Sequence, residues 1–394
     1  MYLKASATVM LLANLFATII FGQEVSIQRP EANPSFTRKE YNPKEFIGKL
    51  NKRINETSGL IYLNGNFYTH NDSGGEPEIY AIDTVDGSIK QTIKINHAVN
   101  IDWEDLTYDV NYLYIGDFGN NNGTRRDLCV YKIPLKEIQK NGDCVANAEK
   151  IGFSYEDQTL FEEKNRSNNY DCEALIAWGD QLILFTKNWG DHKTRLYSLS
   201  KEPGQHQARL LSGFDAKGLI TGADVKPDKQ ELVLCGYLSY EPFIWVIKQF
   251  TPTSIVGWET LRVDFPNRAG SQTEGICFAK DNNLYISSEE TKIYSAKIYK
   301  VDYQKITDKF PEPGEQVFKF DYTILDQTIR LRSQCEGCKK YTITLLNRKG
   351  EVLFHTKIKG VKTETTTLIP FSADERGLVL KLASGSKSAS ARIN

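Results

Sequence analysis

The sequence predicts an all-β fold: a β-propeller, followed by a small β-sandwich-like domain at the C-terminus. A short element recurs five times, and each copy precedes a polar turn and an apolar strand. The copies are Ser58-Gly59-Leu60, Glu104-Asp105-Leu106, Glu173-Ala174-Leu175, Ala223-Asp224-Val225 and Glu274-Gly275-Ile276. Their spacing matches a four-stranded propeller blade of about 40 to 50 residues, with one insertion in the second repeat. The composition agrees, because 20 Tyr and 19 Phe against 2 Met favour strands.

The number of repeats predicts five blades, and a sixth blade, assembled from residues 31–55 and 300–320, is the alternative. A β-sandwich would explain the short alternating strands, but not a fixed unit that recurs along the chain. The insertion spans residues 116–170 and is rich in Asn, Glu, Lys and Asp. It predicts a surface loop over one face of the propeller, where ligands are often held, or a simple solvated excursion.

The two ends of the chain predict export and a second domain. Residues 1–22 have the basic start, apolar run and small residue of a secretory signal peptide, with an uncleaved anchor as the alternative. Residues 23–50 are expected to lead into a propeller over 51–312, and residues 316–394 to form the sandwich. No other apolar run is long enough for a transmembrane helix in the mature chain. The expected location is therefore secreted or on the outer cell surface, with the periplasm in transit.

New alternating strands after residue 316 support the separate C-terminal domain. Residues 341–346 and 351–354 flank Asn347-Arg348-Lys349-Gly350, whose Asn and Gly accept the positive φ that a hairpin turn requires. Cys335 and Cys338 flank a glycine and predict a local disulfide. Pairing of Cys129 with Cys144 across the insertion is left open, and the other three cysteines are expected to be buried.

Acidic residues occupy equivalent positions in several repeats. Glu104, Glu173 and Glu274 share one position, and Asp105 and Asp224 share the next. Because the innermost strand of every blade faces the central channel, equivalent positions should converge on one ring. The second strand of each blade returns to the same face, where it should place four further candidates: Asp72, Asp117, Lys187 and Glu289. The sequence therefore predicts a cluster of carboxylates around the channel, with the three glutamates as metal ligands.

Carboxylates held this close require compensation, because like charges cannot all stay ionised and unpaired. A bound cation, pairing with Lys187, His70 or arginines, or raised pKa values that keep some carboxyls neutral would each provide it. Oxygen-rich ligands suit a hard cation such as Ca²⁺, whereas five histidines without ligand spacing argue against zinc. Internal salt bridges and backbone hydrogen bonds, with no ion, are the alternative.

A metal with an open coordination position could polarise a carbonyl or phosphoryl oxygen, or activate water. That chemistry predicts a Ca²⁺-dependent hydrolase of lactones or phosphate esters, with Asp117 or Glu289 as the general base. No serine-hydrolase elbow, phosphate-binding loop or zinc-protease motif is present in the sequence. The predicted ligand-binding residues are Asp72, Trp103, Asp105, Asp117, Lys187, Trp189 and Asp224. The two tryptophans are expected near the channel mouth, where they could stack on sugars.

Two resemblances follow from motifs in the chain. The first rests on Asn71-Asp72-Ser73-Gly74-Gly75, Asp102-Trp103-Glu104-Asp105-Leu106, Gly116-Asp117-Phe118-Gly119-Asn120 and Gln272-Thr273-Glu274-Gly275-Ile276. With these motifs, residues 51–305 resemble secreted bacterial propellers of the SdiA-regulated and esterase-like phytase groups, and more distantly the gluconolactonase-like propellers. The hairpin at 341–354 and the strand at 377–382 resemble the sorting domains of type IX secretion in Bacteroidetes. An accessory adhesion or substrate-binding sandwich is the alternative.

These observations favour a secreted or cell-surface binding protein with an acidic channel site for an unidentified ligand. The hydrolase is the first alternative, and a structural interaction module of an extracellular assembly is the second. The expected partner is a small molecule, a carbohydrate or a surface protein. A net charge of -1 provides no electrostatic attraction for nucleic acid, so we expect no partner of that class.

Overall fold

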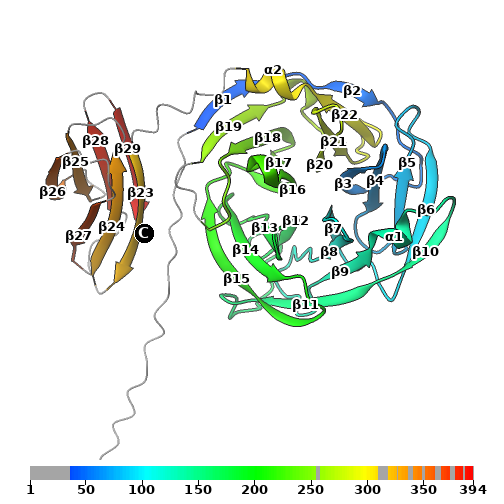
Figure 1. Cartoon of the computed structure of the whole chain (residues 1–394), viewed down its shortest axis with the longest axis horizontal. Helices are drawn as coiled ribbons and strands as arrows, with labels where there is room; N and C mark the ends of the chain where they lie inside the picture. The colour runs from blue at the N-terminus through cyan, green and yellow to red at the C-terminus, as the bar shows by residue number, and fades with distance from the viewer. Residues whose placement is uncertain are drawn as a thin grey trace, which may run out of the picture.

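The computed structural model describes residues 36–253, 258–308, 318–325, 327–335, 340–347, 351–359, 365–372, 378–384 and 387–393. Their regular structure is mainly β-strand, with two short α-helices, α1 (Leu135–Ile138) and α2 (Tyr303–Thr307), and two 3-10 helices. Figure 1 shows most of the sheets radiating from a common centre, as in a β-propeller. The predicted signal peptide, residues 1–22, lies outside the described residues. None of the described helices is long and apolar enough to cross a membrane.

Five inner strands surround the centre of the propeller: β3 (Thr57–Leu63), β7 (Trp103–Tyr108), β12 (Cys172–Trp178), β16 (Leu219–Lys226) and β20 (Thr273–Phe278). Each inner strand contacts the next, and β20 contacts β3, so that the ring is closed. Each begins one of the repeats that the sequence analysis identified. The sequence therefore predicted the inner strands correctly, because every one carries an apolar run between polar turns.

Antiparallel strands extend each inner strand outward. The second strands are β4 (Asn66–Asn71), β8 (Tyr112–Asp117), β13 (Gln181–Thr186), β17 (Glu231–Leu238) and β21 (Leu284–Ser288). The third strands are β5 (Glu78–Ile82), β9 (Cys129–Pro134), β14 (Thr194–Ser200), β18 (Glu241–Lys248) and β22 (Lys297–Val301). Four of these sheets continue into β6 (Ile89–Asn96), β11 (Glu149–Tyr155), β15 (Gly204–Phe214) and β19 (Glu259–Asp264).

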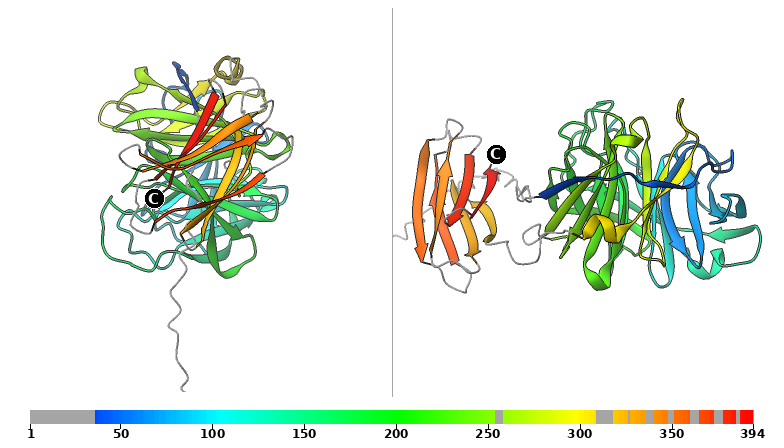
Figure 2. Two further views of the ribbon diagram at one scale, coloured as in Figure 1. Left: turned by 90° about the vertical axis from the view of Figure 1, so that its left-hand side faces the viewer. Right: turned by 90° about the horizontal axis from the view of Figure 1, so that it is seen from above.

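The N-terminal segment closes the propeller at its outer edge. The sheet of β20, β21 and β22 takes its fourth strand from β2 (Lys44–Ile47), which pairs antiparallel with β22. Just before it, β1 (Phe36–Glu40) pairs in parallel with β19 of the preceding sheet. Figure 2 shows this dark blue segment running across the outer strands. Residues 36–47, which lie within the segment expected to lead into the propeller, thus join its last two sheets.

Parallel pairing also links other neighbouring sheets. The short strand β10 (Cys144–Asn147), from the insertion, pairs with β6, and β11 pairs with β15. The insertion therefore contributes ordered outer strands as well as loops, a structure that its polar composition did not predict. Cys129 and Cys144 are both free in the structure, so the disulfide considered between them is wrong.

The hydrophobic core lies between the blades. Five clusters of buried side chains each combine residues from two neighbouring sheets, and together they pass around the whole ring. Pairs that share a cluster are Ile79 with Ile115, Val130 with Leu184, Phe185 with Trp245, Val246 with Ile286, and Tyr285 with Phe67. Because both faces of a blade are covered, its strands read as continuous apolar runs rather than a strict polar and apolar alternation.

All five inner strands break their pairing register near the same end. The irregularities fall between Ser58 and Ile61, Trp103 and Asp105, Cys172 and Ala174, Ile220 and Gly222, and Thr273 and Gly275. A β-bulge adds one residue to one strand and redirects its side chain. The glutamates predicted to form a ring are among these bulged residues.

The C-terminal residues form two sheets packed face to face, which confirms the predicted sandwich (Figure 2). One sheet has the order β23 (Phe318–Leu325), β24 (Thr328–Cys335), β27 (Thr365–Pro370). The other has the order β26 (Val352–Lys359), β25 (Lys340–Leu346), β28 (Leu378–Ser384), β29 (Lys387–Ile393). One hydrophobic cluster joins them, with Leu331 from the first sheet and Ile343 from the second. Cys335 is disulfide-bonded, while Cys338 lies outside the described residues.

Candidate functional site: an acidic cluster at one end of the inner strands

The bulges define structurally equivalent positions in the five inner strands. In four strands the bulged residues are Glu104, Glu173, Thr221 and Glu274, and in β3 the irregularity directly follows Ser58. Two of the neutral members support the ring through backbone contacts to the next blade: Ser58 Oγ donates to Glu104 O at 2.5 Å, and Thr221 Oγ1 donates to Thr273 O at 2.6 Å. In the fourth repeat the equivalent residue is Thr221, not Ala223. The predicted equivalence of Asp105 and Asp224 is therefore wrong.

In three blades, the residue that follows the second strand returns to the start of the inner strand. Asp72 N donates to Glu56 O at 2.9 Å, Lys187 N to Asp171 O at 2.7 Å, and Glu289 N to Gln272 O at 3.0 Å. This repeated backbone contact places Asp72, Lys187 and Glu289 at corresponding points around the same end of the ring. The predicted convergence of second-strand residues with the ring is thus observed for these three.

Two further carboxylates at this end were missed by the sequence analysis. Asp102 and Asp171 lie two residues before the bulged residues Glu104 and Glu173, just outside the strands. A readable signal was present, since both repeats contain Asp-x-Glu, and residues two apart in a strand point to the same side. We refer below to Asp72, Asp102, Glu104, Asp171, Glu173, Lys187, Glu274 and Glu289 as the acidic cluster.

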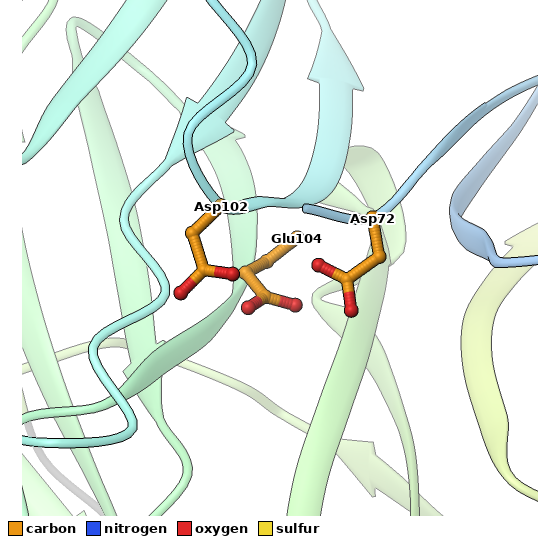
Figure 3. A group of neighbouring side chains, drawn as sticks. All are labelled: Asp72, Asp102 and Glu104. Atoms are coloured by element: carbon orange, nitrogen blue, oxygen red, sulfur yellow. The ribbon is translucent and has the colours of Figure 1, made fainter. Parts of the chain in front are cut away.

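Asp72, Asp102 and Glu104 form the first of two carboxylate triads in this cluster. Each offers an oxygen within 4.8 Å of the others, and the side chains point toward one another (Figure 3). Burial raises the pKa of Asp72 to about 6 and, together with the neighbouring carboxylates, that of Asp102 to about 7. Burial and the charge of Glu173 raise the pKa of Glu104 well above its usual range. Among the described lysines and arginines, none forms an ion pair with this triad.

Glu104, Asp171 and Glu173 form the second triad, which is compensated by the protein itself. Lys187 Nζ donates to Glu173 Oε1 at 2.8 Å. Asp171 accepts from Trp189 Nε1 at 2.7 Å and from Asn120 N at 2.6 Å. The second triad therefore has one hydrogen-bonded ammonium and two further donors. The first triad has no ion pair, although the charges of Lys187 and Arg125 act on Asp72 and Asp102 from a greater distance.

Glu274 and Glu289 lie on the fifth blade, beside the triads. Glu274 is 4% exposed, and its Oε2 has no hydrogen-bond partner in the structure. Glu289 accepts a hydrogen bond from Gln272 Nε2 at 2.9 Å. Burial raises the pKa of each carboxyl to about 8. Both thus belong to the acidic cluster, but neither belongs to a triad.

Asp117, a predicted general base, is instead held as an ionic anchor. Its Oδ1 accepts from Arg125 at 2.9 Å and from the backbone of Asp102 at 3.2 Å. Burial raises the pKa of Asp117, and Arg125 opposes this effect. The side chain therefore fixes the segment that carries Asp102, although its Oδ2 remains without a partner.

Two predicted ligand-binding residues are buried below the cluster. Trp103 is fully buried, and its ring packs against His70 and Tyr131. Asp105 accepts from the backbone of Leu175 at 3.1 Å and of Ala223 at 3.3 Å, so it ties three inner strands together. These contacts make both residues structural rather than ligand-facing, which corrects the prediction.

Asp224 lies farther along β16 and is also structural. Its carboxylate accepts from the backbone of Phe278 at 2.7 Å and of Val225 at 2.8 Å. Burial raises its pKa to about 6. The side chain therefore joins two neighbouring inner strands and does not contribute to the acidic cluster.

Trp189 does lie at the cluster, but its ring is packed against charged side chains and is not an open stacking surface. Lys187 Nζ lies 5.0 Å from the centre of its ring, and Arg166 Cζ lies 5.3 Å from it. Arg166 belongs to the insertion, whose residues Asn120 and Asn168 also hydrogen-bond around Asp171. The insertion thus packs against the second triad instead of forming a purely solvated excursion.

His70 is the one histidine near the cluster, and it does not join either triad. It is fully buried, which lowers its pKa to about 4, and Nε2 has no partner. Both carboxylate triads among the described residues contain oxygen ligands only. The donor set therefore agrees with the expectation that zinc is disfavoured.

Comparison with known proteins adds no assignment. No protein family model matches the chain, and no curated protein matches it. Similar solved structures include a glucose dehydrogenase, with 9% identity over 66% of this chain and 99% of that chain, and a TM-score of 0.39. The calcium-binding protein regucalcin from Agrobacterium tumefaciens strain C58 has 10% identity over 68% of this chain and 96% of that chain, with a TM-score of 0.38.

An exo-β-1,3-galactanase from Phanerochaete chrysosporium has 10% identity over 92% of this chain and 98% of that chain, with a TM-score of 0.41. At these identities and TM-scores, the similarities say nothing about activity or ligand. The function is therefore inferred from the geometry and charges of the acidic cluster.

Proposed function

We propose that this protein is a binding propeller that holds a divalent cation at Asp72, Asp102 and Glu104. The observation that carries the proposal is the contrast between the two triads. The second triad has Lys187 as its counter-charge, whereas the first has no paired lysine or arginine among the described residues. A bound cation would supply the missing charge, because partly buried carboxylates of like charge are costly to ionise together.

Buried polar atoms without partners support a ligand at this end of the ring. They include Asp72 Oδ1, Glu274 Oε2, and the hydroxyls of Ser287 and Ser288 at the end of β21. Buried polar groups in folded proteins normally find a partner, which can be an ion or water. Asp72 Oδ1 belongs to the first triad, and the other atoms lie at the same end of the fifth blade, where an ion with ordered water would give them partners.

The donor chemistry favours Ca²⁺. Three carboxylates offer only hard oxygen ligands, and Ca²⁺ takes six to eight of these in flexible geometries. A triad that lacks nitrogen and sulfur suits zinc and copper poorly. Carboxylates from three side chains cannot fill this shell, so that oxygens of water or of a ligand would complete it.

The charge of the cluster limits the ligand that the ion could recruit. Asp171 and Glu173 complete the second triad, Glu274 and Glu289 lie beside the triads, and Lys187 is the one cation of the cluster. A single Ca²⁺ does not reverse this excess of carboxyl groups. We therefore propose a neutral, oxygen-rich ligand, such as a carbohydrate or another small molecule, or a surface protein, in preference to a phosphate ester. Secretion or display on the outer cell surface is part of the same proposal.

Calcium titration of matched variants tests the site. Glu104→Gln should weaken Ca²⁺ binding at least about 100-fold, because it removes a ligand charge while keeping the side-chain shape. Glu274→Gln should change the dissociation constant less than about threefold, because Glu274 lies outside the triads. The control Asp281→Asn removes a carboxylate that pairs with Lys300 at 2.7 Å, in the turn at the other end of β20 and β21. Unchanged affinity in Glu104→Gln would refute the proposed site.

The calcium-loaded protein also distinguishes binding from the alternative of hydrolysis. A Ca²⁺-dependent hydrolase of lactones or phosphate esters would use the same ion, with Glu289 as the remaining candidate base. We expect no turnover of either substrate class at saturating calcium. Turnover that disappears both in Glu289→Gln and in EDTA would replace the binding proposal with the hydrolase.

A further inference from the structure

Lys187 occupies a place that a metal ion could otherwise take. Its side chain is 7% exposed and follows β13 into the acidic cluster. The ammonium donates to Glu173 at 2.8 Å, and Glu173 shares with Glu104 and Asp171 a set of oxygens within 4.8 Å of one another. The oxygens of the first triad also lie within 4.8 Å of one another. The two triads therefore differ in their counter-charge, because only the second is paired with a cation of the protein, Lys187.

Aromatic rings hold the ammonium in place. Lys187 Nζ lies 5.0 Å from the centre of the Trp189 ring and 5.5 Å from that of Tyr237. Trp189 is itself fixed by its hydrogen bond to Asp171 at 2.7 Å. Burial lowers the pKa of Lys187, but the carboxylates around it outweigh this effect and hold that pKa well above its usual value. The ammonium is thus a permanent and positioned charge, unlike that of a mobile surface lysine.

We propose that the Lys187 ammonium takes the place of a second cation and thereby restricts the acidic cluster to one divalent ion. This inference rests on the proposed function, since it assumes that the first triad binds an ion. Both triads use Glu104, so an ion at each would be bridged by this carboxylate. With Lys187 present, the charge of the second triad is already compensated, and a second ion would have to displace a buried, hydrogen-bonded ammonium.

The restriction matters for what the site can do. Enzymes that hydrolyse phosphate esters with two ions hold them about 3.5 to 4 Å apart, so that both oxygens of the displacement are stabilised. Lys187 leaves this protein with one ion and one fixed ammonium. Lys187 is therefore a specificity-determining residue, which keeps the cluster a single-ion binding site.

Equilibrium dialysis with radiolabelled calcium measures the number of ions per chain. The wild type should bind one ion, and Lys187→Met, which keeps the length of the side chain without its charge, should bind two. The control Lys201→Met removes another largely buried ammonium, which pairs with Asp109 at 2.8 Å outside the cluster, and should still bind one. The double variant Lys187→Met with Glu173→Gln should also bind one, because it lacks a ligand of the second site.

Each outcome separates this inference from the proposed function. A wild type that binds no ion would refute the proposed function. A wild type and a folded Lys187→Met that each bind one ion would overturn the role of Lys187 and leave the first site intact. Lys187→Met is expected to fold in excess calcium, because the second ion replaces the lost charge. If it stays unfolded in excess calcium while the double variant folds, the inference is also overturned.

Discussion

Glu104 connects all of the chemistry proposed for this protein. It is the carboxylate common to both triads, and it lies in the bulge of β7, where the redirected backbone turns its side chain toward Asp72 and Asp102. Its neighbours in the ring have different roles. Glu173 is neutralised by Lys187, and Glu274 lies outside both triads. A single repeat position thus carries three different electrostatic environments.

The raised pKa values of individual carboxyls determine how the stability of the folded protein should depend on pH. In the folded, metal-free protein the pKa is about 7 for Asp102 and about 8 for Glu289, whereas unfolded carboxyls titrate near pH 4. Between the unfolded and the folded pKa the folded state therefore binds more protons, so its stability should fall as the pH rises from about 4 to about 8 and level off above that. His70, with a folded pKa of about 4, acts only below its unfolded value of about 6.5.

Urea denaturation in EDTA checks this dependence. Between pH 6.5 and 8.5 the free energy of unfolding should decrease by at least about 1 kcal/mol, because several coupled carboxyls ionise in this range. Saturating calcium should remove most of the decrease. A stability that stays constant or rises over this range without metal would show that the cluster is not the strained set of carboxyls described here.

The three glutamates of the ring could be predicted from the sequence, but their roles could not. The repeat placed Glu104, Glu173 and Glu274 at one position, and this is confirmed by the bulges. Which glutamate meets a lysine depends on residues from other blades, whose positions no local pattern specifies. Asp102 and Asp171 carried a readable Asp-x-Glu signal that was overlooked.

At the scale of the elements, the inner strands approach one another closely at glycines. A Cβ on Gly275 would lie 2.6 Å from the backbone carbon of Gly59 and 2.7 Å from Leu60, on the neighbouring strand β3. Only a residue without a side chain allows these two strands to touch at the centre of the ring. This close approach lies next to the bulged residue Glu274.

Gly275→Ala should therefore destabilise the propeller by about 1 to 3 kcal/mol, because the added methyl group displaces backbone atoms of β3. Thermal denaturation of the variant measures the loss. Gly48→Ala is the matched control, since its Cβ would meet only the flexible end of Glu45, at 3.5 Å. Equal stability of the two variants would mean that the strands do not approach as closely as described.

Two features at this scale depend on backbone geometry and could not be read from the pattern of side chains. The fourth repeat was aligned on Asp224, because a bulge changes the register without leaving a mark in the sequence. The sequence left residues 36–47 as a lead-in or as part of a sixth blade, and in the structure they pair as β1 and β2 with two outer strands. Both strands join through backbone hydrogen bonds, which depend little on side-chain pattern.

At the scale of the whole molecule, the fold explains why carboxylates gather at one end of the ring. The inner strands touch at Gly59, Gly222 and Gly275, and Asp105 ties three of them together below the cluster. The bulges then turn the carboxylates toward one another above this contact. The propeller and the sandwich were both predictable from the sequence, because periodicity and repeats report architecture directly.

The sandwich remains proposed as a sorting domain, with an accessory binding role as the alternative. Its two sheets share a core of their own, so that it does not depend on the acidic cluster for its stability. If it is a sorting signal, deletion of residues 316–394 should leave the protein in the periplasm, as measured by cell fractionation and surface labelling. Normal surface delivery of the shortened chain would contradict the sorting role.

Binding of one Ca²⁺ at Asp72, Asp102 and Glu104 is tested most directly by a calorimetric titration of the metal-free wild-type protein with Ca²⁺ near neutral pH. We expect saturable binding of one ion per chain, with release of protons from the carboxyls whose pKa values are raised in the free protein. The same titration of Glu104→Gln should show no comparable binding. A wild-type protein that gives no binding heat and no thermal stabilisation at millimolar calcium would contradict the account.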